Sequence, residues 1–441
     1  MKKSLAAGAL LLFAGASLLS GSFRKEDIKV HKLDNGLKIL LLEDHAIPNA
    51  ALYTYFRVGS RNERTGLTGV SHFIEHMMFN GSPKVAPGEF DRRMEFAGGS
   101  NNASTGNDRT GYTDWFPAAV LEQMLEMEAD RMQGATFDPK VLESERQVVA
   151  SERRMGVDNN NDSLLWENVQ ATAIMAHPYH WDVIGWMSDI QGWRRDEILQ
   201  YYKTYYSPNN AVLILVGDFA EVQALELIKK YFGPIPAGTP PPDVITVEPP
   251  QMGTKRVLIK KEAQVPSLQI VWHAPGVRDP GFYPMSILGQ VLLRGESSRL
   301  YRRLVREEQL ATRIFGGQSE TIDPFLFSIY VQPKPDADLT KIEAVIEEEL
   351  AKVKKDGLTE AEIQKVLNAT RSDFYMGLQT ISGKASQLAE TEMTYGNFEK
   401  LFTLMDDYAA VKNPQIIEAA NTYLTDNNKT VGTLIPEGGQ K

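Results

Sequence analysis

Three residues near the start of the chain have the types and spacing of a metal-dependent hydrolase site. The segment VSHFIEHMMFN, residues 70–80, contains His72, Glu75 and His76. Positions i, i+3 and i+4 of a helix share one face, so the two imidazoles could bind one tetrahedral zinc ion. The carboxylate between them could accept a proton from a water molecule activated by that ion. H-x-x-E-H is the inverted zincin motif. We therefore interpret the segment as a metal site rather than as surface residues.

A catalytic zinc site needs a third protein ligand. The segment ESERQVVASERR, residues 143–154, contains two candidates, Glu145 and Glu152. They are seven residues apart, so on a helix both lie on one face, near Val148 and Val149. Burial of a carboxylate without a partner costs free energy, and a zinc ion would be such a partner. The spacing does not choose between the two glutamates, and a solvated charged face is the alternative for this segment.

HFIEH followed by ESERQVVASE resembles the pitrilysin/insulinase family of inverted-zincin metallopeptidases, in its bacterial two-domain type. The likeness covers most of the chain and continues through the segments LDNGLKILLLED, FRVGSRNE, AGGSNNASTGNDRTGYTDW, HPYHWDVIGW and YYSPNNAVLILVGD. In that family the third ligand is a glutamate at a characteristic spacing after the second motif histidine. Glu152 stands at that spacing after His76. A glutamate seven residues earlier supports the family's site, and Glu145 matches that one. The resemblance thus implies one Zn²⁺ per chain, held by His72, His76 and Glu152.

The resemblance also implies an activity. Glu75 would act as general base and then acid in the hydrolysis of peptide bonds, with short or unfolded peptides as substrates. The peptide would add as a strand along a sheet edge formed by Asn102, Ala103, Ser104 and Thr105. On composition alone this polar segment is an edge or a turn.

One feature of the family is missing. Its second half normally contributes an Arg and a Tyr seven residues apart, and the matching stretch here is SSRLYRRLVREEQLATRI, residues 297–314. One alignment register places Val305 and Thr312 at the two positions, and the next places Arg306 and Arg313. Neither register yields the pair. We therefore expect a dimer, either a heterodimer in which a related subunit supplies the Arg/Tyr pair or a homodimer that works without it. A non-catalytic structural or assembly subunit of the same fold is the alternative function.

The fold class follows from the order of the expected elements. Strands and helices alternate irregularly, which favours α+β. The outline of residues 48–59 is repeated at 266–276, each time before a helix that ends at a glycine, which indicates two similar α+β domains. The resemblance implies that they form half of a clamshell-like peptidase chamber. The second copy lacks the His and Glu residues of the first.

A proline-rich linker divides the chain, because GPIPAGTPPPDVITVEPP cannot pair as a central strand. The expected segments are a signal peptide (1–22), a zinc-binding domain (23–232), the linker (233–255) and a homologous domain without a metal motif (256–441). Within the zinc-binding domain we expect strands at 37–43, 50–57, 100–105, 110–116 and 211–217, and helices at 66–80, 87–97, 118–133, 138–156, 163–176, 194–206 and 219–232.

Composition limits the partners. The formal net charge of −10 argues against a nucleic-acid binder, and the absence of cysteine excludes disulfides and thiolate metal sites. Lys2 and Lys3 precede an uncharged apolar run and small residues, the pattern of a secretory signal peptide. We expect export, to the periplasm in a cell with an outer membrane. Membrane contact is expected only if this segment is not cleaved.

Overall fold

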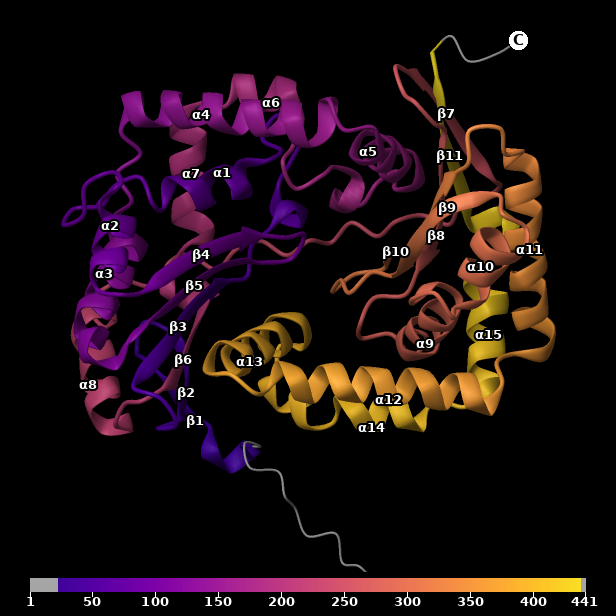
Figure 1. Cartoon of the computed structure of the whole chain (residues 1–441). Coiled ribbons are helices and arrows are strands. Elements are labelled where there is room, and N and C mark those ends of the chain that lie inside the picture. The colour runs from indigo at the N-terminus through magenta and orange to yellow at the C-terminus, as the bar shows by residue number, and fades with distance from the viewer. Residues whose placement is uncertain (1–22, 438–441) are drawn as a thin grey trace, which may run out of the picture.

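The computed structural model describes residues 23–437 and contains two β-sheets, each covered by helices. The expected signal peptide, residues 1–22, lies outside the described residues. Figure 1 shows the first half of the chain, in indigo and magenta, beside the second half, in orange and yellow. Among residues 23–437, no helix combines the length and apolar character needed to cross a membrane.

The first sheet has six strands in the order β1-β2-β6-β3-β5-β4. Their bounds are β1 (Lys29–Lys32), β2 (Lys38–Glu43), β3 (Asn49–Phe56), β4 (Ser100–Thr105), β5 (Thr110–Pro117) and β6 (Ala211–Gly217). β2 and β6 are parallel, and the other neighbours are antiparallel. β4 pairs only with β5 among the described strands, so one of its edges is free for hydrogen bonding.

The second sheet repeats this topology in the order β7-β11-β8-β10-β9. Its strands are β7 (Lys255–Lys261), β8 (Ser267–Ala274), β9 (Ala311–Gln318), β10 (Phe325–Pro333) and β11 (Lys429–Pro436). β7 and β11 are parallel, as β2 and β6 are, and the remaining pairs are antiparallel. Among the strands within residues 23–437, β1 has no counterpart in the second sheet. The matching pair orders confirm the expected α+β fold of two similar domains.

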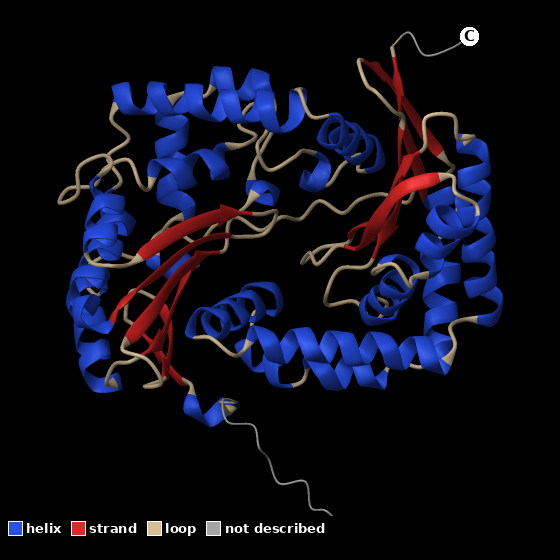
Figure 2. Cartoon of the chain, viewed as in Figure 1, coloured by secondary structure: helices blue, strands red, loops and turns tan. Residues whose placement is uncertain are grey.

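Helices make up most of the remaining chain, as the blue segments of Figure 2 show. The first half contains α1 (Val70–Met77), α2 (Glu89–Phe96), α3 (Leu121–Gly134), α4 (Pro139–Arg153), α5 (Asn161–Ala173), α6 (Met187–Gly192), α7 (Arg195–Tyr205) and α8 (Glu221–Phe232). The second contains α9 (Phe282–Leu293), α10 (Arg299–Tyr301), α11 (Leu339–Asp356), α12 (Glu360–Gly377), α13 (Ile381–Tyr395), α14 (Leu404–Ala410) and α15 (Asn413–Tyr423). Residues 236–252 form neither helix nor strand.

The central strand β6, AVLILVG, is apolar along its whole length because both of its faces are covered. Leu213 and Leu215 belong to the core beneath the helices of the first half. Val212 and Ile214, on the opposite face, pack in a separate cluster with residues of α13. The second half of the chain therefore closes the outer face of the first sheet.

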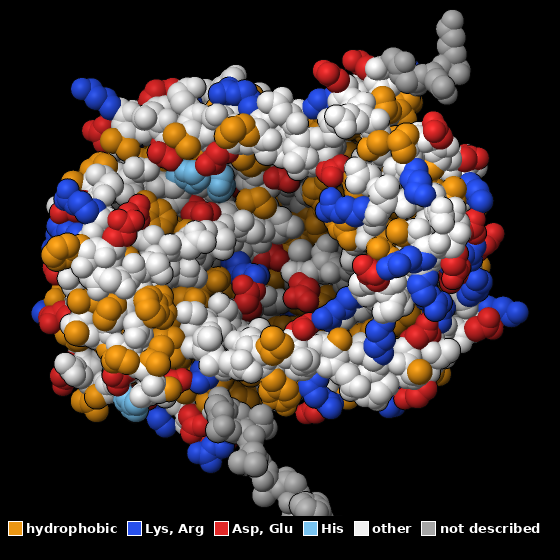
Figure 3. Space-filling view, in the orientation of Figure 1, with side chains coloured by type: hydrophobic (Ala, Val, Ile, Leu, Met, Phe, Trp, Pro, Cys, Tyr) orange, Lys and Arg blue, Asp and Glu red, His pale blue; other side chains and the backbone are white. Residues whose placement is uncertain are grey.

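The first half in turn covers the second sheet, because α5 of the first half packs against β7, β8 and β11. Leu165 and Val169 of α5 share an apolar cluster with Val271 and Leu434. Each half thus contributes one helix to the other's sheet, and apolar burial holds the halves together. The two halves meet around a hollow, visible at the centre of Figure 3, that exposes acidic and basic side chains.

Candidate metal centre

Helix α1 carries the H-x-x-E-H motif with its three polar side chains on one side. Val70, Phe73, Ile74 and Met77 are buried in the core of the first half. His72, Glu75 and His76 are each only partly buried. A helix that buries its apolar stripe in this way must direct the motif residues away from the core.

The structure starts this helix later than expected, at Val70 rather than near residue 66. Gly66 and Gly69 have φ values of +86° and +81°, a left-handed conformation outside the α-helical region. Glu63 accepts hydrogen bonds from the backbone N–H groups of Gly69 and Ser71, at 2.7 and 2.8 Å. Asp189 accepts from Gly66 and from Thr68. Two carboxylates thus satisfy N–H groups at and just before the start of the helix, where the backbone leaves them unpaired.

Helix α4 presents the two candidate glutamates to α1. It begins at Pro139 after Asp138, whose side chain accepts from Lys140 and Val141 and so caps the helix. Val149 is fully buried and anchors the inner face. Val148, expected on the same face, is instead 42% exposed. The apolar part of the inner face is therefore narrower than the sequence suggested.

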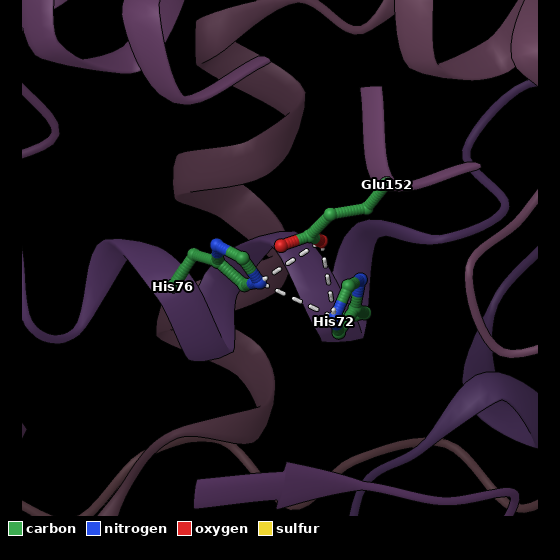
Figure 4. A group of neighbouring side chains, drawn as sticks. All are labelled: His72, His76 and Glu152. Atoms are coloured by element: carbon green, nitrogen blue, oxygen red, sulfur yellow. Dashed lines mark hydrogen bonds and ion pairs between the residues drawn. The ribbon is translucent and has the colours of Figure 1, made fainter. Parts of the chain in front are cut away.

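His72, His76 and Glu152 come together as Figure 4 shows, with one potential ligand atom from each lying within 4.8 Å of the others. The two Nε2 atoms are 3.3 Å apart, and Glu152 Oε2 is 3.5 Å from His76 Nε2 and 4.0 Å from His72 Nε2. Ligand atoms bound at about 2.0–2.1 Å to a tetrahedral ion are separated by about 3.3–3.4 Å. The residues therefore fit a zinc ion held by two imidazoles and one carboxylate.

Glu145 does not join this triangle. Its Oε1 instead lies 2.7 Å from His76 Nδ1. A carboxylate at this position accepts the Nδ1 proton and leaves the lone pair of Nε2 facing Glu152 and His72. The two glutamates that sequence spacing could not distinguish thus have different contacts.

The electrostatic setting suits a bound cation. Burial, with a smaller contribution from the charge of His76, lowers the pKa of His72 to about 4, so this imidazole is neutral near pH 7. Burial also acts against protonation of His76. The hydrogen bond to Glu145 and the charges of Glu152, Glu145 and Glu75 outweigh it, however, and raise the pKa of His76. The carboxylates that favour a proton on His76 would also favour a divalent metal ion.

Glu75 lies beside the cluster and close to strand β4. Thr105 donates a hydrogen bond from its hydroxyl to Glu75 Oε2 at 2.5 Å. Burial raises the pKa of Glu75, and the hydrogen bond from Thr105 opposes that increase. A carboxyl group with a raised pKa, at the edge of a candidate metal site, has the properties of a general base.

The residues expected to bind substrate all lie on β4. Asn102 and Ser104 are exposed, whereas Ala103 and Thr105 are half-buried, as expected for alternate side chains of an edge strand. A cavity of about 320 Å³ lies between β4 and α1. Its lining includes Glu75, His76, Asn102 and Ala103. In Figure 3, histidine side chains in pale blue, flanked by acidic ones, are accessible on the face beneath α4.

The two arginines of the second alignment register, Arg306 and Arg313, lie apart from each other in the second half of the chain. Arg306 forms an exposed ion pair with Glu296. Arg313 lies on the edge strand β9, with its guanidinium carbon 4.4 Å from the ring centre of Phe315. An Arg stacked on an aromatic ring differs in shape and reach from a tyrosine hydroxyl.

Several residues that shape the centre were not predicted from the sequence. Glu63 and Asp189 accept hydrogen bonds from the backbone near the start of α1, Arg153 at the end of α4 pairs with Glu167, and the Thr105 hydroxyl contacts Glu75. A partial signal was present, because ESERQVVASER contains the triplet Ser-Glu-Arg twice, seven residues apart. Contacts between distant parts of the chain have no such local pattern.

The fold and the centre together define a two-domain α+β protein with the ligand set of an inverted zincin. The family model described as "Insulinase (Peptidase family M16)" matches residues 38–185, and that described as "Peptidase M16 inactive domain" matches residues 192–370. The chain belongs to peptidase family M16, as the pitrilysin/insulinase resemblance implied. The second description agrees with a second half that lacks a metal motif.

Relatives and solved structures agree with this assignment. The chain is 30% identical over 437 residues to the zinc protease PqqE of Helicobacter pylori, with 97% of each chain covered. It is 25% identical to the uncharacterized zinc protease YmxG of Bacillus subtilis, covering 91% of this chain and 96% of the relative. The crystal structure of a protease from Helicobacter pylori superposes with a TM-score of 0.89 at 29% identity, covering 93% of this chain and 99% of that one.

Proposed function

We propose that the protein is a zinc metalloendopeptidase that hydrolyses peptide bonds in short or unfolded peptides. The observation that carries the proposal is the triangle of His72, His76 and Glu152, whose ligand-atom distances suit zinc, with Glu75 at its edge. The naming of several relatives as zinc proteases supports it.

A zinc ion bound by these residues would supply a Lewis acid that polarises the scissile carbonyl and acidifies a water molecule. The side chains of the chain perform the proton transfers. Glu75 accepts a proton from the attacking water at its carboxylate and then delivers it to the leaving amine nitrogen. Thr105 holds one oxygen of Glu75 at 2.5 Å and so limits its orientations. Glu145 accepts the Nδ1 proton of His76, so the Nε2 lone pair of that ring would be available to a metal ion.

The free edge of β4 supports binding of the substrate as an added strand. Backbone N–H and C=O groups at a sheet edge can hold peptides of diverse sequence. The scissile bond would then lie beside Glu75, because Thr105 at the end of β4 contacts that residue. The adjacent cavity of about 320 Å³ can take one side chain of the bound peptide.

A related partner subunit is part of the proposal. No Arg/Tyr pair stands seven residues apart in the stretch 297–314, so a heterodimer would supply it, whereas a homodimer would have to work without it. The periplasmic protease PqqL from Escherichia coli matches in fold at a TM-score of 0.77 and 20% identity, but this chain covers only 48% of it. That relation supports a functional unit larger than one copy of this chain. We also propose export to the periplasm, on the basis of the N-terminal sequence.

A non-catalytic subunit is the competing function, and the missing Arg/Tyr pair favours it. The intact ligand set and Glu75 argue against it, because a purely structural subunit needs neither. The two functions differ in what the purified chain does with metal and with peptides.

The deciding experiment is cleavage of a mixed pool of unstructured peptides by residues 23–441, with metal analysis, beside Glu75→Gln. We expect one zinc per chain in both proteins and no cleavage by Glu75→Gln. Chelator-sensitive cleavage by the wild-type chain alone would establish a peptidase that needs no partner. Bound zinc without cleavage would indicate that activity requires the related subunit. Absence of both zinc binding and cleavage would refute the proposed peptidase.

A further inference from the structure

The triplet Ser-Glu-Arg occurs twice on α4, at residues 144–146 and 151–153. In each copy the glutamate faces the metal centre and the arginine is buried on another side of the helix. Arg146 donates to the backbone carbonyls of Ile190 and Trp193. Arg153 has a different set of partners, which connect the metal ligand Glu152 to the rest of the molecule.

Arg153 is 4% exposed and forms a two-pronged ion pair with Glu167 of α5. Its Nη1 lies 2.5 Å from Oε1 and its Nη2 lies 2.8 Å from Oε2. Nη1 also donates to the backbone carbonyl of Gly185 at 2.6 Å. Paired, charged hydrogen bonds of this kind are strong and restrict orientation.

The Gly185 segment lies directly against the start of α1. A Cβ atom added at Gly69 would come within 2.2 Å of the carbonyl oxygen of Ile184, so the two backbones are in contact. Trp186 donates its backbone N–H to the hydroxyl of Thr68 at 2.9 Å. Arg153 therefore connects the end of the helix that carries Glu152 to the beginning of the helix that carries His72 and His76.

Glu152 depends on such a connection because of where it lies. It is the last residue but one of α4, and residues 154–158 continue as a π-helix, in which the α-helical hydrogen-bond pattern is lost. Its side chain is 38% exposed. Among residues 23–437, its carboxylate makes polar contacts only with His72 and His76. No other polar contact within the described chain fixes that carboxylate, so its position depends on the backbone at residue 152.

We propose that Arg153 is a positioning residue for the metal ligand Glu152, acting through its contacts with Glu167 and Gly185. The inference rests on the proposed zinc site. In this proposal Arg153 maintains the spacing between α1 and α4. The distances from Glu152 to the two imidazoles depend on that spacing. Removing the arginine leaves all three ligands in the sequence but frees the end of α4.

The test is a double-mutant cycle on zinc affinity, measured by competition with a chromophoric chelator. The four proteins are the wild-type chain, Arg153→Met, Glu152→Gln and the double variant. We expect Arg153→Met to weaken zinc binding by about 10–100-fold, the range for residues that orient metal ligands. In the Glu152→Gln background the same change should alter affinity by less than about threefold, because the positioned ligand is already gone.

A control separates positioning from general destabilisation. Arg299 forms a similar two-pronged pair with Glu362 in the second half, with both distances 2.7 Å. Arg299→Met should lower the melting temperature of the metal-free protein and leave zinc affinity unchanged. If Arg153→Met is too unstable to study, Arg153→Met with Glu167→Leu removes both charges, so no buried charge is left unpaired. That variant should fold and still bind zinc weakly.

Two results would overturn the proposal. The first is an Arg153→Met protein that melts earlier but binds zinc as tightly as the wild-type chain. The second is an equal loss of affinity in the wild-type and Glu152→Gln backgrounds. Failure of the underlying zinc site would look different, because the wild-type chain itself would then bind no zinc.

Discussion

Glu145 Oε1 lies 2.7 Å from Nδ1 of His76, while the Nε2 atom of the same ring faces His72 at 3.3 Å. The Nδ1 atom of His76 is thus hydrogen-bonded to a carboxylate, and the Nε2 atom remains available to a metal ion. The contact explains why two glutamates seven residues apart on α4 both face α1 although only one, Glu152, lies in the ligand triangle.

Glu145→Gln should weaken zinc binding without removing a ligand. The amide oxygen can still accept the Nδ1 proton, so the ring keeps its orientation but loses the negative charge that makes Nε2 a better ligand. We expect about a tenfold loss of affinity by chelator competition. Glu143→Gln, at an exposed residue of the same helix, should leave the affinity unchanged. Equal affinities for Glu145→Gln and the wild-type chain would show that the charge has no role.

Thr105→Val should shift the pH dependence of peptide cleavage. The Thr105 hydroxyl stabilises the charged form of Glu75 and so lowers its pKa. Valine has nearly the same shape but cannot donate, so the pKa of Glu75 should increase. Because the base acts when deprotonated, the acidic limb of kcat/KM against pH should move to higher pH. The measurement is that profile for both proteins with one peptide and, if needed, the partner subunit. A shift toward lower pH would contradict the assigned hydrogen bond.

Gly69→Ala should be far more damaging than Gly88→Ala, although both glycines precede a helix in the left-handed conformation. Their φ values are +81° and +70°, so alanine at either site costs about 1–2 kcal/mol in backbone strain. Only at Gly69 would the new Cβ meet the backbone, 2.2 Å from the carbonyl oxygen of Ile184, whereas nothing lies within 4 Å at Gly88. Urea unfolding of the two variants measures the difference, and similar losses would refute the close contact.

Glu362→Gln should reduce stability at neutral pH but not in strong acid. The hydrogen bond from Arg299, with help from Thr359, lowers the pKa of Glu362 to about 2 in the folded protein. An acid whose folded pKa lies below its unfolded pKa adds stability above the unfolded value, near 4.5, and loses it as pH falls toward 2.

Unfolding of wild-type and Glu362→Gln proteins at pH 7 and at pH 3 would check this expectation. The gap between their free energies of unfolding should narrow at the lower pH. Because the pair lies in the second half, zinc content should be the same in both proteins. A gap that widened in acid would show that the carboxyl group is not held charged by Arg299.

Much of this protein follows from sequence, because the relevant signals are local. Helical spacing alone put His72, Glu75 and His76 on one side of a helix, and apolar runs located β2, β3, β5 and β6 within one residue. The polar strand β4 was expected at its observed bounds, although its composition alone indicates an edge or a turn. The helix at residues 66–80 was overextended, because Gly69 needs a left-handed backbone to approach residue 184. Strand β1 and helix α6 were missed, since four to six residues carry too little periodicity to be distinguished from a loop.

The tertiary structure decided what spacing could not. Glu145 and Glu152 lie on the same side of a helical wheel, and only the packing of α4 against α1 shows that Glu145 contacts His76 Nδ1 and that Glu152 completes the ligand triangle. The exchange of α5 and α13 between the halves, the link from Arg153 to Glu167, and the hydrogen bond from Thr105 to Glu75 are likewise contacts between distant segments. A sequence determines periodicity along one element, but it is packing in three dimensions that selects which faces meet.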